Sequence, residues 1–261
     1  MEKRKNIILA AINVVWFAVM VTVNALANIL PINGKNTGEI SDQYPNLFVP
    51  AGITFSIWGL IYLLLLIFVI NQLYLAVKEK TMGLLSIKSS LVFGLTCILN
   101  ALWILAWHYE IVALSLLIMV GLLLSLIYLF RQIEASLPLN KQGIIAVSVP
   151  ISVYLGWISV ATIANVTSLL VSVNWNSFGI APIIWTILMI LVGGALGVIM
   201  LLKKQNIAYA AVILWAYAGI IIKRMAEDPV RNEILYVVYG VMAVIIVLMI
   251  NTIVRMARKR Q

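Results

Sequence analysis

Residues 51–77 read AGITFSIWGLIYLLLLIFVINQLYLAV, a continuous apolar run that contains no charged side chain. A helix needs about 20 consecutive, predominantly apolar residues to cross the hydrocarbon core of a bilayer. This run is long enough to do so. We therefore predict a transmembrane helix here, and the remainder of the chain repeats the same pattern.

The composition of the whole chain points to lipid as its solvent. Of the 261 residues, 64% are hydrophobic and only 10% are charged, whereas soluble domains carry about 25% charged residues. Too few polar side chains are present to cover the surface of a soluble protein. The net charge of +9 does not indicate nucleic-acid binding, because the basic residues form short clusters between apolar runs. Cys97 is the only cysteine, which excludes a disulfide framework.

Eight runs qualify or nearly qualify as spans. They are residues 7–29, 51–77, 87–108, 111–130, 143–168, 181–202, 207–223 and 233–254. The first is longer than a signal-peptide core and lacks a clear cleavage site, so we read it as a retained span. The predicted fold class is all-α, a polytopic transmembrane helical bundle of about eight spans.

The basic residues also predict the orientation, because Lys and Arg favour the cytoplasmic side. With the N-terminus inside, 14 of the 18 basic residues fall in inner segments. The four outer ones are Lys35, Lys223, Arg224 and Arg231. Seven spans would instead leave the basic C-terminal tail outside. We therefore expect a multi-pass protein of the cell membrane with both termini in the cytoplasm.

Three of the predicted spans each carry aromatic residues together with a hydroxyl or amide on one helical face. In this orientation most of these side chains gather in the outer half of the membrane. The three sets are Phe55, Trp58 and Tyr62; Asn100, Trp103 and Trp107; and Tyr154, Trp157 and Asn165. Amides in hydrocarbon are costly unless they are paired, so we expect them to face the bundle interior.

Two interpretations of these side chains remain open. In the first, Trp and Tyr form the aromatic belt at the membrane interface and Asn side chains join helix to helix. In the second, they wall an apolar pocket with a few amide donors, a lining that suits a planar or polycyclic hydrophobic ligand.

The order and spacing of these residues resemble motifs of a known family. Pro50 with Phe55, Trp58 and Tyr62 resembles a Pro-Pro…Trp-x-x-x-Tyr segment; Asn100 and Trp103 resemble Leu-Asn-x-x-Trp; and Tyr154, Trp157 and Asn165 resemble Pro-Tyr-x-x-Trp…Leu-Asn. In this order, residues 47–175 resemble the TspO/MBR family, the tryptophan-rich sensory proteins and mitochondrial translocator protein. The chain departs from the family pattern at Val49 and Val153, where prolines are expected.

The resemblance implies a TspO-like five-helix core at residues 1–175. It says nothing of residues 176–261, which the apolar runs predict to be three further helices of the same membrane domain. It implies a receptor or sensor that binds a porphyrin or other tetrapyrrole, or a sterol-like molecule, in a pocket capped by the loop at 30–49. Transport of that ligand, or tryptophan-dependent porphyrin degradation, is the alternative. The implied ligand-binding residues are Pro50, Phe55, Trp58, Tyr62, Asn100, Trp103, Trp107, Tyr154, Trp157 and Asn165.

Few other residues suggest chemistry. No hydrolase triad, metal site, phosphate loop or nucleotide fingerprint is present, so we name no catalytic residue. His108 is the only histidine; we expect it to be solvated, with axial ligation of a bound haem as the alternative.

Two further clusters leave alternatives open. Lys223 and Arg224 could receive the propionates of a ligand, or could pair with Glu227 and Asp228. The small residues at 193, 194 and 197 predict close helix packing, within the chain or across a homodimer.

Overall fold

The computed structural model describes residues 2–78 and 86–258, and within these ranges the chain is helical without strands. Eight of the described helices are long and apolar enough to cross a membrane, which confirms the predicted number. They are α1 (Glu2–Ile29), α3 (Ile57–Val77), α4 (Ile87–His108), α5 (Val112–Ala135), α7 (Val149–Ser172), α8 (Pro182–Lys204), α9 (Ile207–Met225) and α10 (Asn232–Arg258).

Shorter elements join or extend these helices. The segment after α1 is an ordered cover, which we define as residues 30–56 and call the cover segment. It contains the 3-10 turns η1 (Ile32–Gly34) and η2 (Gly52–Ser56) and the helix α2 (Thr37–Asp42). A one-turn helix α6 (Lys141–Gly143) and a π-helical turn η3 (Ile144–Ser148) lead into α7, and η4 (Ser177–Gly179) precedes α8.

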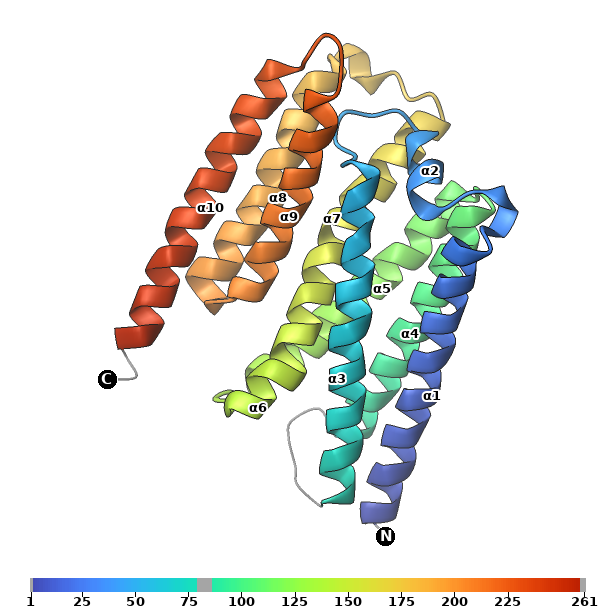
Figure 1. Ribbon diagram of the computed structural model, residues 1–261, viewed down its shortest axis with the longest axis vertical. Coiled ribbons are helices and arrows are strands. Elements are labelled where there is room, and N and C mark those ends of the chain that lie inside the picture. Colours follow the sequence, from blue (N-terminus) through green and yellow to red (C-terminus); the bar gives the residue numbers. More distant parts are fainter. Residues whose placement is uncertain (1, 79–85, 259–261) are drawn as a thin grey trace.

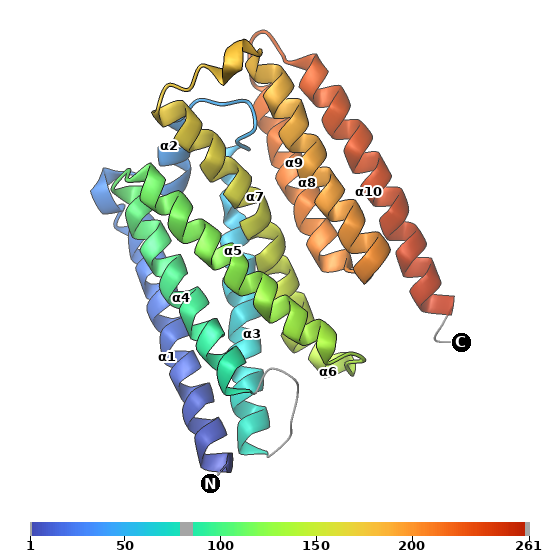
Figure 2. The same ribbon diagram turned by 180° about the vertical axis from the view of Figure 1, so that it is seen from behind.

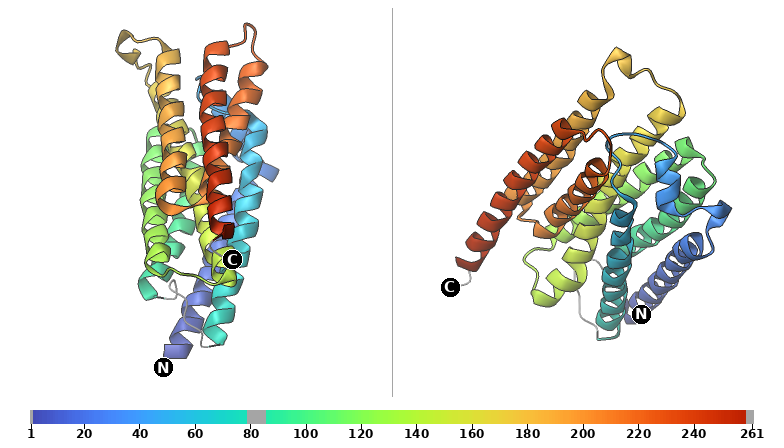
Figure 3. Two further views of the ribbon diagram at one scale, coloured as in Figure 1. Left: turned by 90° about the vertical axis from the view of Figure 1, so that its left-hand side faces the viewer. Right: turned by 45° about the horizontal axis from the view of Figure 1, so that its top comes forward.

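Five helices close into a ring in the order α1, α4, α5, α7, α3. The last three helices pack on one another, and α9 joins this group to α7. Figures 1 and 2 show α8, α9 and α10 on one side of α7 and the rest of the ring on the other. Figure 3 shows that α10 forms the outer edge of the group. This grouping agrees with the division at residue 175, which we keep as a proposal.

The two prolines in the spans have different effects. Pro182 lies in the first turn of α8, where its missing N–H leaves no hydrogen bond unmade. Pro150 lies inside a longer helical stretch that runs from residue 141 to 172. Proline removes one hydrogen bond of such a stretch, and the π-helical turn η3 directly precedes it.

The small residues of α8 pack inside the chain. A Cβ atom on Gly193 would lie 2.8 Å from the hydroxyl of Tyr217 on α9, and one on Gly197 would lie 3.2 Å from Ile245 on α10. These glycines therefore allow α9 and α10 to approach α8 closely. The structure assigns them to packing within the chain.

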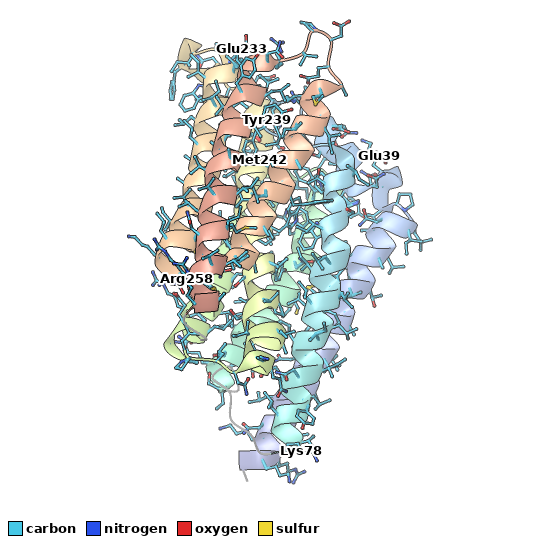
Figure 4. All side chains as sticks on the ribbon, turned by 60° about the vertical axis from the view of Figure 1, so that its left-hand side comes forward. Glu39, Lys78, Glu233, Tyr239, Met242 and Arg258 are labelled. Carbon is cyan, nitrogen blue, oxygen red and sulfur yellow. The ribbon has the colours of Figure 1, made fainter. Side chains whose placement is uncertain are left out.

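Charged side chains mark the two ends of the bundle. Figure 4 shows Glu39 and Glu233 at the end that carries the cover segment, and Lys78 and Arg258 toward the opposite end. Both termini lie toward this second end (Figure 1). We call the end that carries the cover segment the far end. An even number of spans and this distribution of charge fit the predicted topology; which end faces the cytoplasm stays a prediction.

Candidate functional site

The aromatic residues of α3, α4 and α7 meet in one cluster near the far end. Trp58 is its centre: its ring centroid lies 5.9 Å from that of Trp103, 6.0 Å from Tyr154 and 6.4 Å from Trp157. Tyr62 stacks on Trp58 at 5.6 Å. Aromatic pairs at such separations stabilise packing by about 0.5–1.5 kcal/mol beyond the burial of their surface. The rings therefore hold three helices together.

Two further aromatic contacts extend the cluster. Phe55 packs edge-on against Trp157 at 5.8 Å, and Trp107 stacks with Trp103 at 6.3 Å. Tyr44 of the cover segment reaches Trp107 at 5.8 Å. Burial of Tyr44, and secondarily the negative charge of Glu110, raises the pKa of its hydroxyl, so the ring stays neutral at physiological pH.

The amide side chains join the helices behind these rings. Asn24 on α1 donates to Asn100 on α4 at 2.7 Å, and Asn100 donates to the hydroxyl of Tyr154 on α7 at 2.8 Å. Asn100 and Tyr154 are fully buried. This chain of hydrogen bonds satisfies polar groups that hydrocarbon could not.

A second amide has the same role nearer the cover. Asn165 accepts hydrogen bonds from the indole of Trp103 at 3.3 Å and from Ser115 at 3.0 Å, and its amide donates to the carbonyl of Ala161. The helix-to-helix interpretation of the asparagines therefore describes both Asn100 and Asn165.

The cluster surrounds a small cavity of about 20 Å³. This volume holds about one water molecule and is far too small for a tetrapyrrole. Seven of the ten predicted residues line it: Pro50, Phe55, Trp58, Trp103, Trp107, Trp157 and Asn165. Tyr62, Asn100 and Tyr154 do not; they support the lining residues from behind.

Three of the lining residues carry a buried polar group without a hydrogen-bond partner within the described residues. They are the indole N–H groups of Trp58 and Trp157 and the hydroxyl of Ser168. A buried donor without a partner costs about 1–3 kcal/mol. These groups therefore favour an acceptor atom that enters the cavity.

The cover segment closes the cavity from the far end. The indole of Trp107 donates to the carbonyl oxygen of Thr37 at 3.3 Å, and Asn28 accepts from the backbone N–H of Thr37 at 3.3 Å. Asn36 caps α2 reciprocally with Glu39, an arrangement that satisfies two exposed donors of the first turn. The predicted capping loop is therefore an ordered helical cover.

The cover segment is also held by α9. Ala51 donates its backbone N–H to the carbonyl of Gly219 at 3.0 Å, and the indole of Trp215 donates to the carbonyl of Thr54 at 2.9 Å. Thus one of the three C-terminal helices holds the cover over a cavity formed by the five-helix ring.

His108 differs from the prediction that it would be solvated. It is fully buried, and its Nδ1 lies 2.8 Å from the carbonyl of Ile104 one turn earlier. The cover packs over it, since Asn33 donates to its carbonyl oxygen at 3.0 Å. His108 does not line the cavity. Within residues 2–78 and 86–258, no group of three His, Cys, Asp or Glu side chains could hold a metal ion.

The two basic residues at the end of α9 have different partners. Arg224 pairs with Glu227 at 2.7 Å, as expected. Lys223 pairs with Asp42 of α2 at 2.6 Å instead of with either nearby carboxylate, Glu227 or Asp228. Asp42 is distant in sequence, and only the packing of α2 near α9 brings the two together.

Sequence reasoning missed part of the cavity lining on α7. Val160, Ala161, Ala164 and Ser168 face the tryptophans. These positions continue the helical face that starts at Tyr154 and Trp157. Their small size was the available signal, because only small side chains leave room beside four indole rings.

Fold and site together define a polytopic helical membrane protein with a small, tryptophan-walled cavity under a helical cover. A family model described as TSPO-like protein matches residues 10–253, and the chain belongs to this family. The match extends over the three C-terminal helices, beyond the residues that carry the motifs. No curated protein and no solved structure matches the chain.

Proposed function

We propose that this protein is a membrane receptor or sensor that binds a planar hydrophobic ligand, with a tetrapyrrole as the first candidate. The observation that carries the proposal is the pair of unpartnered indole N–H groups on Trp58 and Trp157, which line one aromatic cavity. Apolar walls with a few polar groups are typical of small-molecule sites. Membership of the TSPO-like family supports the same assignment.

In this proposal the ligand lies between the indole rings of Trp58, Trp103, Trp107 and Trp157, with Pro50 and Phe55 toward the cover. Ring faces stack on a planar ligand, and the N–H groups of Trp58 and Trp157 donate to its acceptor atoms. The other polar residues hold the wall helices in register. Asn100, Tyr154 and Asn165 do so through hydrogen bonds within the protein. Tyr62 does so by stacking on Trp58 from behind.

Binding requires the cavity to expand from about 20 Å³, so the cover must move. Its polar attachments to the helices are single hydrogen bonds and ion pairs, among them the Trp107–Thr37 bond, the Ala51–Gly219 bond and the Lys223–Asp42 ion pair. Single hydrogen bonds of this kind each contribute about 0.5–1.5 kcal/mol. A ligand that displaces the cover would signal its presence at the far end of the molecule, which suits a sensor.

The test is titration of purified protein in nanodiscs with protoporphyrin IX, followed by saturable quenching of tryptophan fluorescence. The double variant Trp58→Phe and Trp157→Phe keeps an aromatic ring at each position, although a smaller one, and removes two donors that have no partner within the described residues. We expect it to fold normally and to bind about tenfold more weakly, the effect of losing about 1.4 kcal/mol.

The matched control is Trp16→Phe, which removes an indole from the half-exposed face of α1 and should leave the affinity unchanged. Equal affinity of the double variant and the control would contradict the proposed site. Ligand flux through liposomes that carry the protein would favour transport instead of sensing.

A further inference from the structure

A second, much larger hollow lies at the far end, between α7, α8, α9 and residues 42–48 of the cover segment. We call it the cleft; its volume is about 630 Å³. Sites for small molecules have volumes of about 300–1,000 Å³, so the cleft is large enough without any rearrangement. It shares no lining residue with the aromatic cavity.

One part of the cleft is apolar. Trp175 and Trp185 pack together with ring centroids 5.3 Å apart, and both line the cleft with Phe48, Leu170 and Met189. The indole of Trp185 already donates to the carbonyl of Ser177 at 3.1 Å. These walls therefore offer aromatic and aliphatic surface, which suits the hydrophobic body of a ligand.

The other part of the cleft is basic, with Arg224 at its base. Arg224 is only 1% exposed, and its Nη1 forms an ion pair with Glu227 at 2.7 Å. Its Nε has no hydrogen-bond partner within the described residues. A guanidinium has five N–H donors and no acceptor. Arg224 can therefore donate a hydrogen bond to a ligand's acceptor atom and keep its ion pair with Glu227.

Lys223 lines the cleft beside Arg224. Its partner Asp42 has a side chain that is 57% exposed. Ion pairs with this degree of exposure contribute about 0–1 kcal/mol, so a ligand can displace Asp42 at low cost. The charged residues that line the cleft are Lys223, Arg224, Asp42 and Glu227. A ligand that displaces Asp42 from Lys223 therefore needs to carry a single negative charge to take its place.

We propose that the cleft is a binding site for an amphiphile with an apolar body and a carboxylate head group. The body packs against Trp175, Trp185 and Met189, and the carboxylate accepts hydrogen bonds from Arg224 and Lys223. A monoanion fits because it takes the place of Asp42 beside Lys223, whereas Glu227 stays paired with Arg224 and would repel a dianionic head group more strongly. This site and its ligand class are separate from those of the aromatic cavity.

The test compares a brominated fatty acid with the fatty alcohol of the same chain, using protein in phosphatidylcholine nanodiscs. Bromine atoms beside Trp175 and Trp185 quench their fluorescence. The same titration is run with the Trp175→Phe and Trp185→Phe double variant. The part of the quenching that this variant lacks measures binding in the cleft. We expect the acid to bind there at least about tenfold more tightly than the alcohol, the effect of a charge-assisted hydrogen bond.

Charge variants then locate the head group. Lys223→Gln and Arg224→Gln should each weaken binding of the acid by about tenfold and leave the alcohol unchanged. Lys35→Gln is the matched control, since Lys35 also forms an exposed ion pair at the far end, with Glu110. If Arg224→Gln does not fold, Lys223→Gln decides, together with Met189→Trp, which narrows the apolar part of the cleft and should weaken binding of both probes.

Equal binding of acid and alcohol would overturn the proposal, as would acid binding that Lys223→Gln and Met189→Trp leave intact. The acid is also titrated in nanodiscs that contain phosphatidylglycerol in the proportion of anionic lipid found in membranes. If this lipid displaces the acid completely, the cleft binds a lipid phosphate instead. The Trp58→Phe and Trp157→Phe double variant should bind the acid normally, so the two sites can fail independently.

Discussion

The backbone N–H of Ala51 donates a hydrogen bond to the carbonyl oxygen of Gly219 at 3.0 Å. The first residue belongs to the cover segment and the second to the middle of α9. The absence of a side chain at Gly219 permits this approach: a Cβ atom there would collide with Thr54 and would lie 2.9 Å from the Cβ of Pro50. The cover over the aromatic cavity is therefore built against a helix that lies outside the five-helix ring.

We predict that Gly219→Ala weakens this junction. The added methyl meets Thr54 and the ring of Pro50, neither of which is the end of a flexible side chain, and overpacking of this kind costs about 1–3 kcal/mol. A lower thermal unfolding midpoint in detergent would show the effect. The matched control is Gly240→Ala on α10, where a Cβ atom meets nothing within 4 Å; it should be neutral or stabilising, because alanine favours helix more than glycine does. Equal stability of the two variants would argue against the junction.

We predict that Asn100→Leu destabilises the helix ring by about 1–2 kcal/mol, the upper range for hydrogen bonds between membrane helices. The substitution leaves the hydroxyl of Tyr154 without the donor that now lies 2.8 Å away. Adding Tyr154→Phe to Asn100→Leu should lower the free energy of unfolding little further, because both substitutions remove the same hydrogen bond. Asn251→Leu on an exposed face of α10 is the control. Additive losses for Asn100 and Tyr154 would show that the two side chains act independently.

We predict that the far end faces away from the cytoplasm. Glu233 and Arg258 lie at opposite ends of the single helix α10 (Figure 4). In intact cells, a membrane-impermeant maleimide should label Glu233→Cys, whereas Arg258→Cys should require permeabilised cells. Cys97 is buried and should give little background. The reverse labelling would invert the topology and would contradict the orientation derived from the basic residues.

The predicted spans agree closely with the helices because span length and apolarity are local properties. The prediction of 87–108 matches α4 in both bounds, whereas α5 and α7 extend some residues beyond the predicted ends. Helix ends depend on capping and on which polar residues a neighbour can satisfy. The 3.6-residue repeat likewise predicted an aromatic face on each of three helices, and these faces carry Trp58, Trp103 and Trp157.

The contents of the interior were not predictable in the same way. The asparagines could equally have faced a ligand or another helix, and only the packing shows that Asn100 and Asn165 bond to neighbouring helices. His108 was expected in solvent, but the cover segment buries it. These outcomes depend on where the chain outside the spans folds back, which apolar periodicity does not encode.

The sequence by itself determined that the chain crosses the membrane in eight helices, because lipid requires apolar runs. It also determined that the tryptophans of the second, third and fifth spans lie on aromatic faces, because helical geometry places residues on faces. Tertiary structure decided that the aromatic cavity is small, that Lys223 meets Asp42 across the fold, and that an open cleft lies beside α9. The physical reason is that cavities and ion pairs are formed between elements far apart in the chain. Their dimensions depend on how side chains from several helices fill the same space.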